Sequence, residues 1–204
     1  MEQITYEKGF TAQPLPEEII KKIDGKSYRE NHDIGLDELA YLKMLYVDFH
    51  GMTQTGVMIV HYSLAKEVLE IFCELYKAGY QIEKMRLVDE YDADDERSMA
   101  DNNSSAFNYR VVADTDIVSM HAYGRAIDIN PLINPYIVAG KIMPANAEKY
   151  ADRTKNFAHK IDHNDLAYKL FKARGWTWGG DWKTQKDYQH FYKTYLLAQL
   201  LKTP

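Results

Sequence analysis

The sequence predicts an α+β domain in which helices cover one face of a mainly antiparallel sheet. Residues 63–79 and 164–175 carry the apolar spacing and end signals of helices, whereas 57–60, 82–88 and 126–130 are short apolar or alternating runs typical of strands. With 204 residues, 46% of them hydrophobic, the chain is long enough for one substantial core and too short for two. We therefore expect a single domain over residues 36–204, preceded by an arm of residues 1–35.

Composition and charge disfavour several classes of protein. The chain has 25 basic and 30 acidic residues, a formal net charge of −5, and no block of like charges. A nucleic-acid partner is disfavoured because neutralising phosphates requires a basic surface. Cys73 is the only cysteine, so no intramolecular disulfide can form, and we expect it to be a small buried side chain. The N-terminal residues contain no apolar run long enough for an export signal or a membrane span, so we expect neither.

The N-terminal third is predicted to contain few regular elements. The arm should hold one short helix, which begins at Pro16 and ends at Gly25. In residues 36–46 the apolar side chains recur at a spacing that suggests a helix. A polar turn then leads into a short strand at 57–60.

The clearest helix of the chain covers residues 63–79. Ser63 can cap its start, Gly79 can end it, and the apolar residues between them form one broad face that should pack on a sheet. The following strand, 82–88, leads into the polar stretch 90–110. Loops of that length are uncommon in compact domains and are often functional, so we expect this one to serve a site.

The C-terminal half is predicted to alternate strands, turns and one further helix. After the strand at 126–130, the sequence PLINPY should form a rigid turn, followed by a loop with a short helix up to about residue 153. Asn164 can cap a helix that ends at Gly175. Tryptophans then crowd one segment and should form core or cleft wall: Trp176, Trp178 and Trp182. A closing helix is expected at 195–201.

The stretch Ser119–Asn130 carries the first two candidate metal ligands. Residues 126–130 alternate so that Ile127 and Ile129 face one side of a strand and Asp128 the other. Gly124 lets the backbone turn just before that strand, so that His121 can fold back beside Asp128. An imidazole and a carboxylate are ligands that Zn²⁺ takes, and a catalytic zinc usually has three protein ligands and a water. One ligand is missing from this stretch.

The sequence KDYQHFY supplies the third candidate ligand and a candidate base. His190 is the expected ligand, and Asp187 stands three residues before it. A carboxylate so placed could face the same metal without binding it and accept the proton of the attacking water. Together these residues predict the layout of a metal-dependent hydrolase.

The remaining histidines offer a weaker, rival metal site. His159 and His163 would share one face of a helix, as zinc-binding pairs do, but Lys160 stands where such a motif requires a glutamate. His50 and His61 are expected to be surface or hydrogen-bonded residues.

Several motifs together resemble one family of zinc peptidases. Every fixed position of S-x-H-x-x-G-x-A-x-D is filled, by Ser119, His121, Gly124, Ala126 and Asp128. This signature, with DYQHF, GWTWGGDW and NNSSAFNYR, is similar to that of the D-alanyl-D-alanine carboxypeptidase (VanY-like) zinc metallopeptidases and their hedgehog-fold relatives. The resemblance runs from about residue 63 to 192. The sequence departs from the family pattern at Tyr192, where many relatives carry an acidic residue. This difference affects a residue that would contact a metal ligand, not a ligand itself.

The resemblance implies a fold and a set of site residues. The fold would be hedgehog-type, with the zinc cleft on the sheet face opposite the helices. A peptidase of this kind uses an arginine from the polar stretch to stabilise the oxyanion, a role we place on Arg110 ahead of Arg97 and Arg125. The alternative for Arg110 is a structural ion pair with one acid of that stretch: Asp92, Asp94, Asp95 or Asp101. Ser119, Tyr123 and Trp178 are the expected substrate-binding residues, Ser119 as a support for the metal loop.

The resemblance also implies a function and a location. We expect one Zn²⁺ and a D-alanyl-D-alanine carboxypeptidase acting on bacterial cell-wall (peptidoglycan) peptides, in the cell envelope or secreted, although the cytoplasm stays open because no export signal is visible. An L-alanyl-D-glutamate endopeptidase and a non-catalytic, zinc-containing cell-wall binding module are the alternatives, together with a metal-free globular domain. We expect a monomer.

Overall fold

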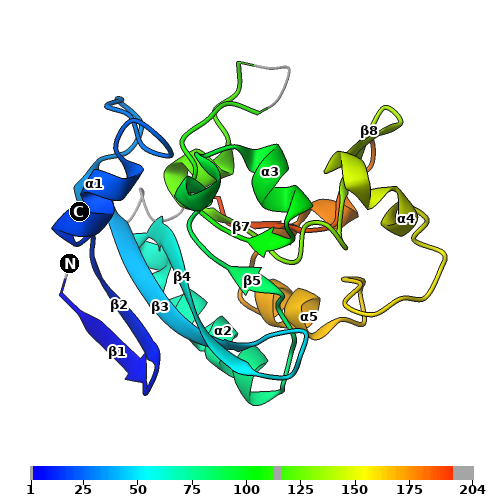
Figure 1. Ribbon diagram of the computed structural model, residues 1–204, viewed down its shortest axis with the longest axis horizontal. Coiled ribbons are helices and arrows are strands. Elements are labelled where there is room, and N and C mark those ends of the chain that lie inside the picture. The colour runs from blue at the N-terminus through cyan, green and yellow to red at the C-terminus, as the bar shows by residue number, and fades with distance from the viewer. Residues whose placement is uncertain (1, 113–115, 195–204) are drawn as a thin grey trace, which may run out of the picture.

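The main sheet lies in the N-terminal half of the chain and is antiparallel throughout. In the computed structural model, which describes residues 2–112 and 116–194, its order is β1-β2-β3-β4 (Figure 1). The strands are β1 (Ile4–Glu7), β2 (Phe10–Pro14), β3 (Leu39–Val47) and β4 (Thr53–His61). Residues 4–14 of the expected arm thus add two strands to the sheet that holds β3 and β4.

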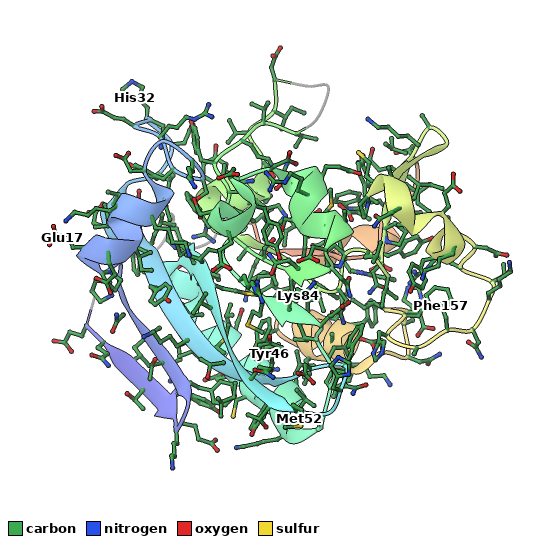
Figure 2. The ribbon with its side chains drawn as sticks, in the orientation of Figure 1. Glu17, His32, Tyr46, Met52, Lys84 and Phe157 are labelled. Carbon is green, nitrogen blue, oxygen red and sulfur yellow. The ribbon has the colours of Figure 1, made fainter. Side chains whose placement is uncertain are left out.

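Both faces of this sheet are covered where β3 begins. Alternate residues of β3, Ala40 and Leu42, pack in the largest core cluster with the helix α2 (Ala65–Lys77). Leu39 and Tyr41 point to the other face and pack with Ile23 of the helix α1 (Glu17–Ile23). Helices therefore are not confined to one face of the main sheet, contrary to the expectation from sequence. Figure 2 shows the side chains that fill the space between these layers.

The C-terminal half contains smaller sheets. One has the order β10-β12-β7 and consists of β10 (Thr177–Trp178), β12 (His190–Tyr192) and β7 (Ala126–Asp128). Another has the order β11-β8-β9 and consists of β11 (Lys186–Asp187), β8 (Tyr136–Val138) and β9 (Lys141–Met143). All these pairs are antiparallel, whereas β5 (Lys84–Met85) and β6 (Asn103–Ser104) pair in parallel.

Short helices surround these sheets (Figure 1). The α-helices are α3 (Asp95–Ala100), α4 (Glu148–Ala151) and α5 (Leu166–Ala173). Single turns of 3₁₀-helix occur at η1 (Leu36–Glu38), η2 (Tyr62–Leu64), η3 (Val88–Tyr91), η4 (Met120–Tyr123), η5 (Ala145–Ala147) and η6 (Gly179–Asp181). No helix among the described residues is long and apolar enough to cross a membrane.

Some sequence predictions are confirmed. The helix expected at 63–79 is η2 followed by α2, the strand expected at 57–60 is the end of β4, and the helix expected at 164–175 is α5. Its cap is Asp165 rather than Asn164, since the Asp165 carboxylate accepts hydrogen bonds from the backbone N–H groups of Ala167 and Tyr168. Cys73 is buried, as expected. The helix expected at 195–201 lies outside the described residues.

Other predictions are wrong. The helix expected at 36–46 is the strand β3, because its nearly continuous apolar run alternates between two buried faces. The strand expected at 82–88 shrinks to β5, and the polar stretch 90–110 contains α3 and β6 instead of being loop alone. In α3 the Asp94 side chain caps the first turn, which gives a polar sequence a helical start.

Candidate metal centre

The pairing of β7 with β12 sets two of the expected ligands directly opposite each other. In the antiparallel register, His190 is the partner of Asp128, although 62 residues separate them in the sequence. Cross-strand neighbours on one face have Cβ atoms only ~4.5–5.5 Å apart, so their side chains meet. Ile127, the residue before Asp128 and the register partner of Phe191, points the other way into the main core. The alternation seen in the sequence is therefore the alternation of the folded strand.

The third expected ligand reaches this pair from the turn η4. Ser119 caps that turn by accepting a hydrogen bond from the backbone N–H of His121. Gly124 ends it with a left-handed φ of 62°. A Cβ at Gly124 would lie 2.5 Å from the backbone nitrogen of His61, so β4 can approach the turn only if this residue is glycine.

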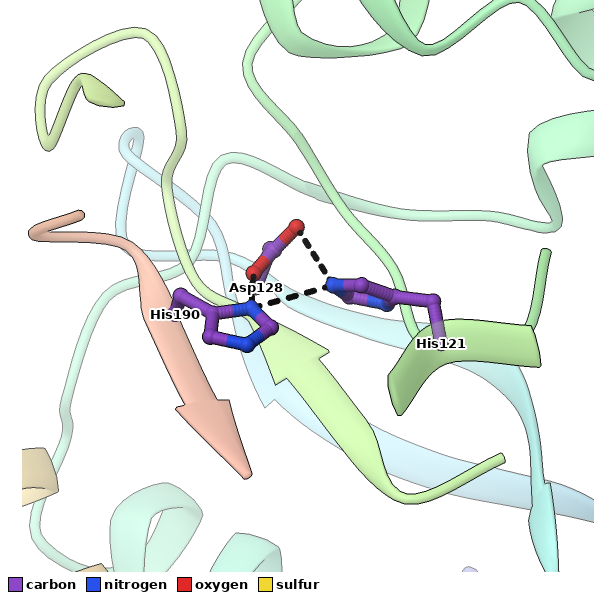
Figure 3. A group of neighbouring side chains, drawn as sticks. All are labelled: His121, Asp128 and His190. Carbon is purple, nitrogen blue, oxygen red and sulfur yellow. Dashed lines mark hydrogen bonds and ion pairs between the residues drawn. The ribbon is translucent and has the colours of Figure 1, made fainter. Parts of the chain in front are cut away.

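The three side chains form a tight cluster of possible ligand atoms (Figure 3). His121 Nε2 lies 3.1 Å from His190 Nδ1 and 3.1 Å from Asp128 Oδ2, and His190 Nδ1 lies 2.9 Å from Asp128 Oδ1. Ligand atoms ~2.0–2.2 Å from one tetrahedral zinc are ~3.3–3.6 Å apart, so a small outward shift of these side chains makes room for a single ion. All three residues are buried, and among the described residues no other His, Cys, Asp and Glu side chains form such a group.

The donor chemistry of the cluster also fits a metal ion. His121 Nδ1 donates to the backbone carbonyl of Ala106, so in the neutral ring Nε2 carries a lone pair aimed at the other two side chains. Burial opposes a charge on His121, yet the Asp128 carboxylate outweighs burial and raises the pKa of His121. Burial likewise opposes the charge of Asp128, but His121 and His190 hold its pKa well below the ordinary value. The cluster thus favours a positive charge at its centre, which a metal ion can supply.

Asp187 lies beside this cluster in the strand β11. Burial raises the pKa of Asp187 to about 7, with the charges of His190, Asp128 and Arg110 as further influences. Its Oδ1 atom is buried and has no hydrogen-bond partner in the described part of the chain. Gly179 packs against it, because a Cβ there would lie 2.7 Å from the Asp187 Cβ and 2.6 Å from its carbonyl oxygen.

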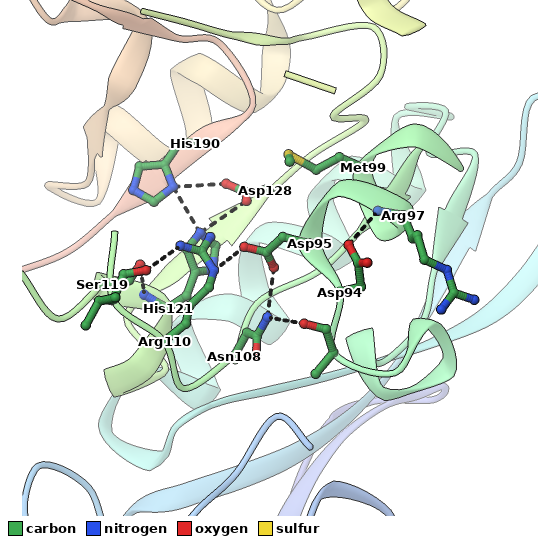
Figure 4. Close-up of polar contacts among 12 residues, drawn as sticks. Asp94, Asp95, Arg97, Met99, Asn108, Arg110, Ser119, His121, Asp128 and His190 are labelled. Atoms are coloured by element: carbon green, nitrogen blue, oxygen red, sulfur yellow. Dashed lines mark hydrogen bonds and ion pairs between the residues drawn. The ribbon is translucent and has the colours of Figure 1, made fainter. Parts of the chain in front are cut away.

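Arg110 stands next to the metal loop and is held by a carboxylate. The backbone N–H of Ser119 donates to the carbonyl of Arg110, which ties the two segments together. The Arg110 guanidinium pairs with Asp95, whose other oxygen accepts from the Asn108 side-chain amide at 2.8 Å (Figure 4). An ion pair with Asp95 was one of the structural alternatives to an oxyanion role for Arg110. The Arg110 side chain is 33% exposed, and a guanidinium has five N–H donors, so donors remain beyond this pair.

The other two arginines considered for this role lie elsewhere. Arg97 is 59% exposed and pairs with Asp92 at 3.2 Å. Arg125 is buried on the side of β7 opposite Asp128, where its Nη2 lies 3.3 Å from Ser63 Oγ and 3.4 Å from His61 Nδ1. Neither guanidinium has a described contact with the three candidate ligands.

The expected substrate-binding residues have different surroundings. Ser119 is buried and supports η4. Tyr123 is half-buried, and its hydroxyl donates to Asp33 at 3.5 Å. Trp178 is 2% exposed, packs in the main core and donates from Nε1 to the carbonyl of Tyr188.

Aromatic rings that sequence reasoning did not select lie against the ligand His190 instead. The Trp182 ring centroid is 5.7 Å from that of His190, and the Tyr192 ring is stacked on His190 at 5.5 Å. Tyr192 occupies the position where an acidic residue was expected. The signal for Trp182 was present in GGDW, but three tryptophans in seven residues could not be ranked without the fold.

The rival histidine pair does not assemble a site. His159 stacks on Phe49 with ring centroids 3.8 Å apart and has a positive φ of 61°, so it does not lie in a helix. His163 pairs with Asp181 at 2.9 Å and packs edge-on against Trp178.

Comparison with known proteins supports the resemblance found in the motifs. Residues 113–193 match the model of a family described as D-alanyl-D-alanine carboxypeptidase. The match agrees with the expected family over this segment and spans His121, Asp128, Asp187 and His190, whereas Arg110 precedes it. No curated protein and no solved structure is significantly similar to the chain.

Proposed function

We propose that this protein, whose residues 113–193 match the D-alanyl-D-alanine carboxypeptidase family, is a zinc-dependent peptidase that removes the terminal D-alanine of peptidoglycan stem peptides. The observation that carries the proposal is the buried group of His121, Asp128 and His190 with Asp187 beside it. Two imidazoles and a carboxylate form a ligand set of catalytic rather than structural zinc sites, which are mostly closed by four protein ligands.

In this proposal His121, Asp128 and His190 hold one zinc ion. When bound, zinc polarises the scissile carbonyl and makes water a stronger acid. The hydrogen bond from His121 Nδ1 to the Ala106 carbonyl fixes the ring so that Nε2 faces the site. Burial of all three ligands excludes bulk water from one side of the centre.

Asp187 acts as the general base and then as the general acid. Its carboxylate accepts a proton from the attacking water and delivers that proton to the leaving amine nitrogen. A carboxyl whose pKa is raised by burial to about 7 is suited to both steps, because it can gain and lose a proton near neutral pH. The unpartnered Oδ1 leaves one oxygen open for this exchange.

Arg110 stabilises the negative charge that develops on the attacked carbonyl oxygen. Asp95 and the backbone tie to Ser119 hold the guanidinium beside the metal loop before substrate arrives. A charge fixed in advance needs no reorganisation during the reaction. Because the substrate lies outside the cell membrane, we place the protein in the cell envelope or outside the cell.

A defined stem pentapeptide tests the proposal. Zinc-loaded protein should release one D-alanine, seen by mass spectrometry as a tetrapeptide product. A product cut within the stem would instead indicate an endopeptidase, and binding without cleavage would indicate a recognition module.

The Asp187→Ala variant isolates the chemical step. It should lose ~10²–10⁴ in kcat, the usual range for a general base, and still bind zinc at a ratio of one. Asp181→Ala is a matched control, since Asp181 is an exposed acid of the same segment that pairs with Lys172 and His163. An Asp187→Ala protein with the wild-type rate would show that the base is another residue.

A further inference from the structure

A cavity of about 430 Å³ lies beside Arg110, and the N-terminal arm contributes three of its ten lining residues, Gly25, Lys26 and Arg29. Lys26 and Arg29 of the arm form one wall, Asp92 and Ala93 another, and Tyr109 and Arg110 a third. This volume lies in the range of small-molecule and peptide side-chain sites, ~300–1,000 Å³. Of its lining, only Val118 falls within the segment that matches the family.

The arm is fastened to the rest of the protein at this cavity. Ser27 is fully buried, and its hydroxyl and backbone N–H both donate to the Asp89 carboxylate, at 2.8 and 3.2 Å. The backbone N–H of Tyr109 donates to the Ser27 carbonyl, and the Tyr109 hydroxyl donates to Asp33 at 2.6 Å. The chain is therefore held by hydrogen bonds on both sides of Arg29, at Ser27 and at Asp33.

The charges that line the cavity do not balance. Lys26 pairs with Asp92 at 3.0 Å, and Asp92 is shared with Arg97. Arg110 is paired with Asp95. Arg29 is exposed, and no carboxylate of the described residues pairs with it. Three cations against one acid in the lining give a site that attracts an anion, and a guanidinium binds a carboxylate through two parallel hydrogen bonds.

Arg110 links the cavity to the candidate metal centre. Arg110 lines the cavity, and its segment is hydrogen-bonded to Ser119, two residues before the candidate ligand His121. Its charge also acts on the pKa of both His121 and Asp187. A peptide whose scissile carbonyl lies at Arg110 can therefore extend a carboxylate into the cavity.

We propose that this cavity is a substrate subsite for a carboxylate group of the peptide, and that Arg29 of the N-terminal arm makes the enzyme selective for acidic peptides. The inference rests on the proposed peptidase function. Arg29 is a specificity-determining residue in it and has no part in the chemical step.

The test compares wild type and Arg29→Gln on peptides with one common scissile bond. One peptide has both a free C-terminal carboxylate and a glutamate side chain, the second has a C-terminal carboxamide, and the third has glutamine in place of glutamate. Arg29→Gln should lower kcat/KM on the first peptide by about 10-fold, mainly through KM. The same substitution should have little effect on the peptide that lacks the recognised carboxylate, which identifies that group.

Lys22→Gln is the control, because it removes the same charge from α1 at a lysine that pairs with Glu90 and does not line the cavity. It should leave the selectivity among the three peptides unchanged. If Arg29→Gln changes kcat/KM equally on all three peptides, or on none, the subsite is disproved while the peptidase function stands.

Binding measurements separate the two proposals when no peptide is cleaved. Calorimetry with zinc-loaded wild type and Arg29→Gln would then show whether the free-acid peptide still binds through Arg29. Binding that depends on Arg29 without cleavage would retain the subsite and reject the peptidase. Equal or absent binding would reject the subsite as well.

Discussion

The proposed role of Arg110 in stabilising the oxyanion can be tested by kinetics. Arg110→Gln should lower kcat by ~10²–10³, the usual effect of removing one oxyanion donor, with zinc content unchanged. Arg97→Gln is a suitable control, since Arg97 lies in the same region and is paired with Asp92 on the surface. Steady-state kinetics on the pentapeptide give the comparison. A loss confined to KM would show instead that Arg110 only binds substrate.

The candidate ligands could be selected from sequence because they stand at the fixed positions of short local motifs. His121 and Asp128 lie seven residues apart around Gly124, and the turn and strand between them follow from local rules. The meeting with His190 was an inference across 62 residues, and the β7–β12 register brings it about. Asp95 as the partner of Arg110 could be named only among four acids, because the choice depends on how α3 packs.

Among the elements, the turn η6 positions the strand that carries Asp187. Gly179→Ala would put a Cβ 2.6 Å from the Asp187 carbonyl oxygen, so β11 must shift. Activity should fall at least ~10-fold, because small displacements of a catalytic group are costly, while zinc stays bound. Gly175→Ala is the control: its Cβ meets nothing within 4 Å, but its φ of 78° costs stability. If Gly179→Ala keeps full activity, η6 does not position the base.

The elements that sequence reasoning missed share one cause. The apolar run in β3 fits a helix by spacing alone, and only the pairing with β2 and β4 decides that it is a strand. β5 and β6 contain two residues each and are defined by a parallel contact across the chain, which no local pattern signals. By contrast, α2 was predictable, because the apolar face and the residues that begin and end the helix all lie in one continuous segment of the sequence.

For the whole molecule, Asp165 makes stability depend on pH. Burial raises the pKa of Asp165 from 3.8 to about 6, where it caps α5 and accepts from the Tyr80 hydroxyl at the end of α2. Folding therefore favours the protonated acid. The protonated Asp165 side chain therefore contributes to the free energy of unfolding. This contribution is fully present below pH 3.8 and is lost as the pH rises through about 6.

Asp165→Asn should remove this dependence, because asparagine caps a helix equally well and cannot ionise. Urea unfolding should show the variant to be more stable by about 3 kcal/mol at pH 8, with the difference vanishing below about pH 3. Asp24→Asn, at an exposed residue that does not act on the pKa of Asp165, is the charge-matched control. A stability difference that is constant with pH would show that Asp165 ionises as easily in the folded protein as in the unfolded chain.

The antiparallel register between β7 and β12 has a consequence for the nascent protein. His190 comes from the last strand that the structure describes, so a chain emerging from the ribosome carries only two of the three candidate metal ligands until residue 190 has been synthesised. A partly made chain should therefore hold no hydrolytic centre. The proposed capacity to cut peptides would appear only once β12 has been translated and has paired with β7.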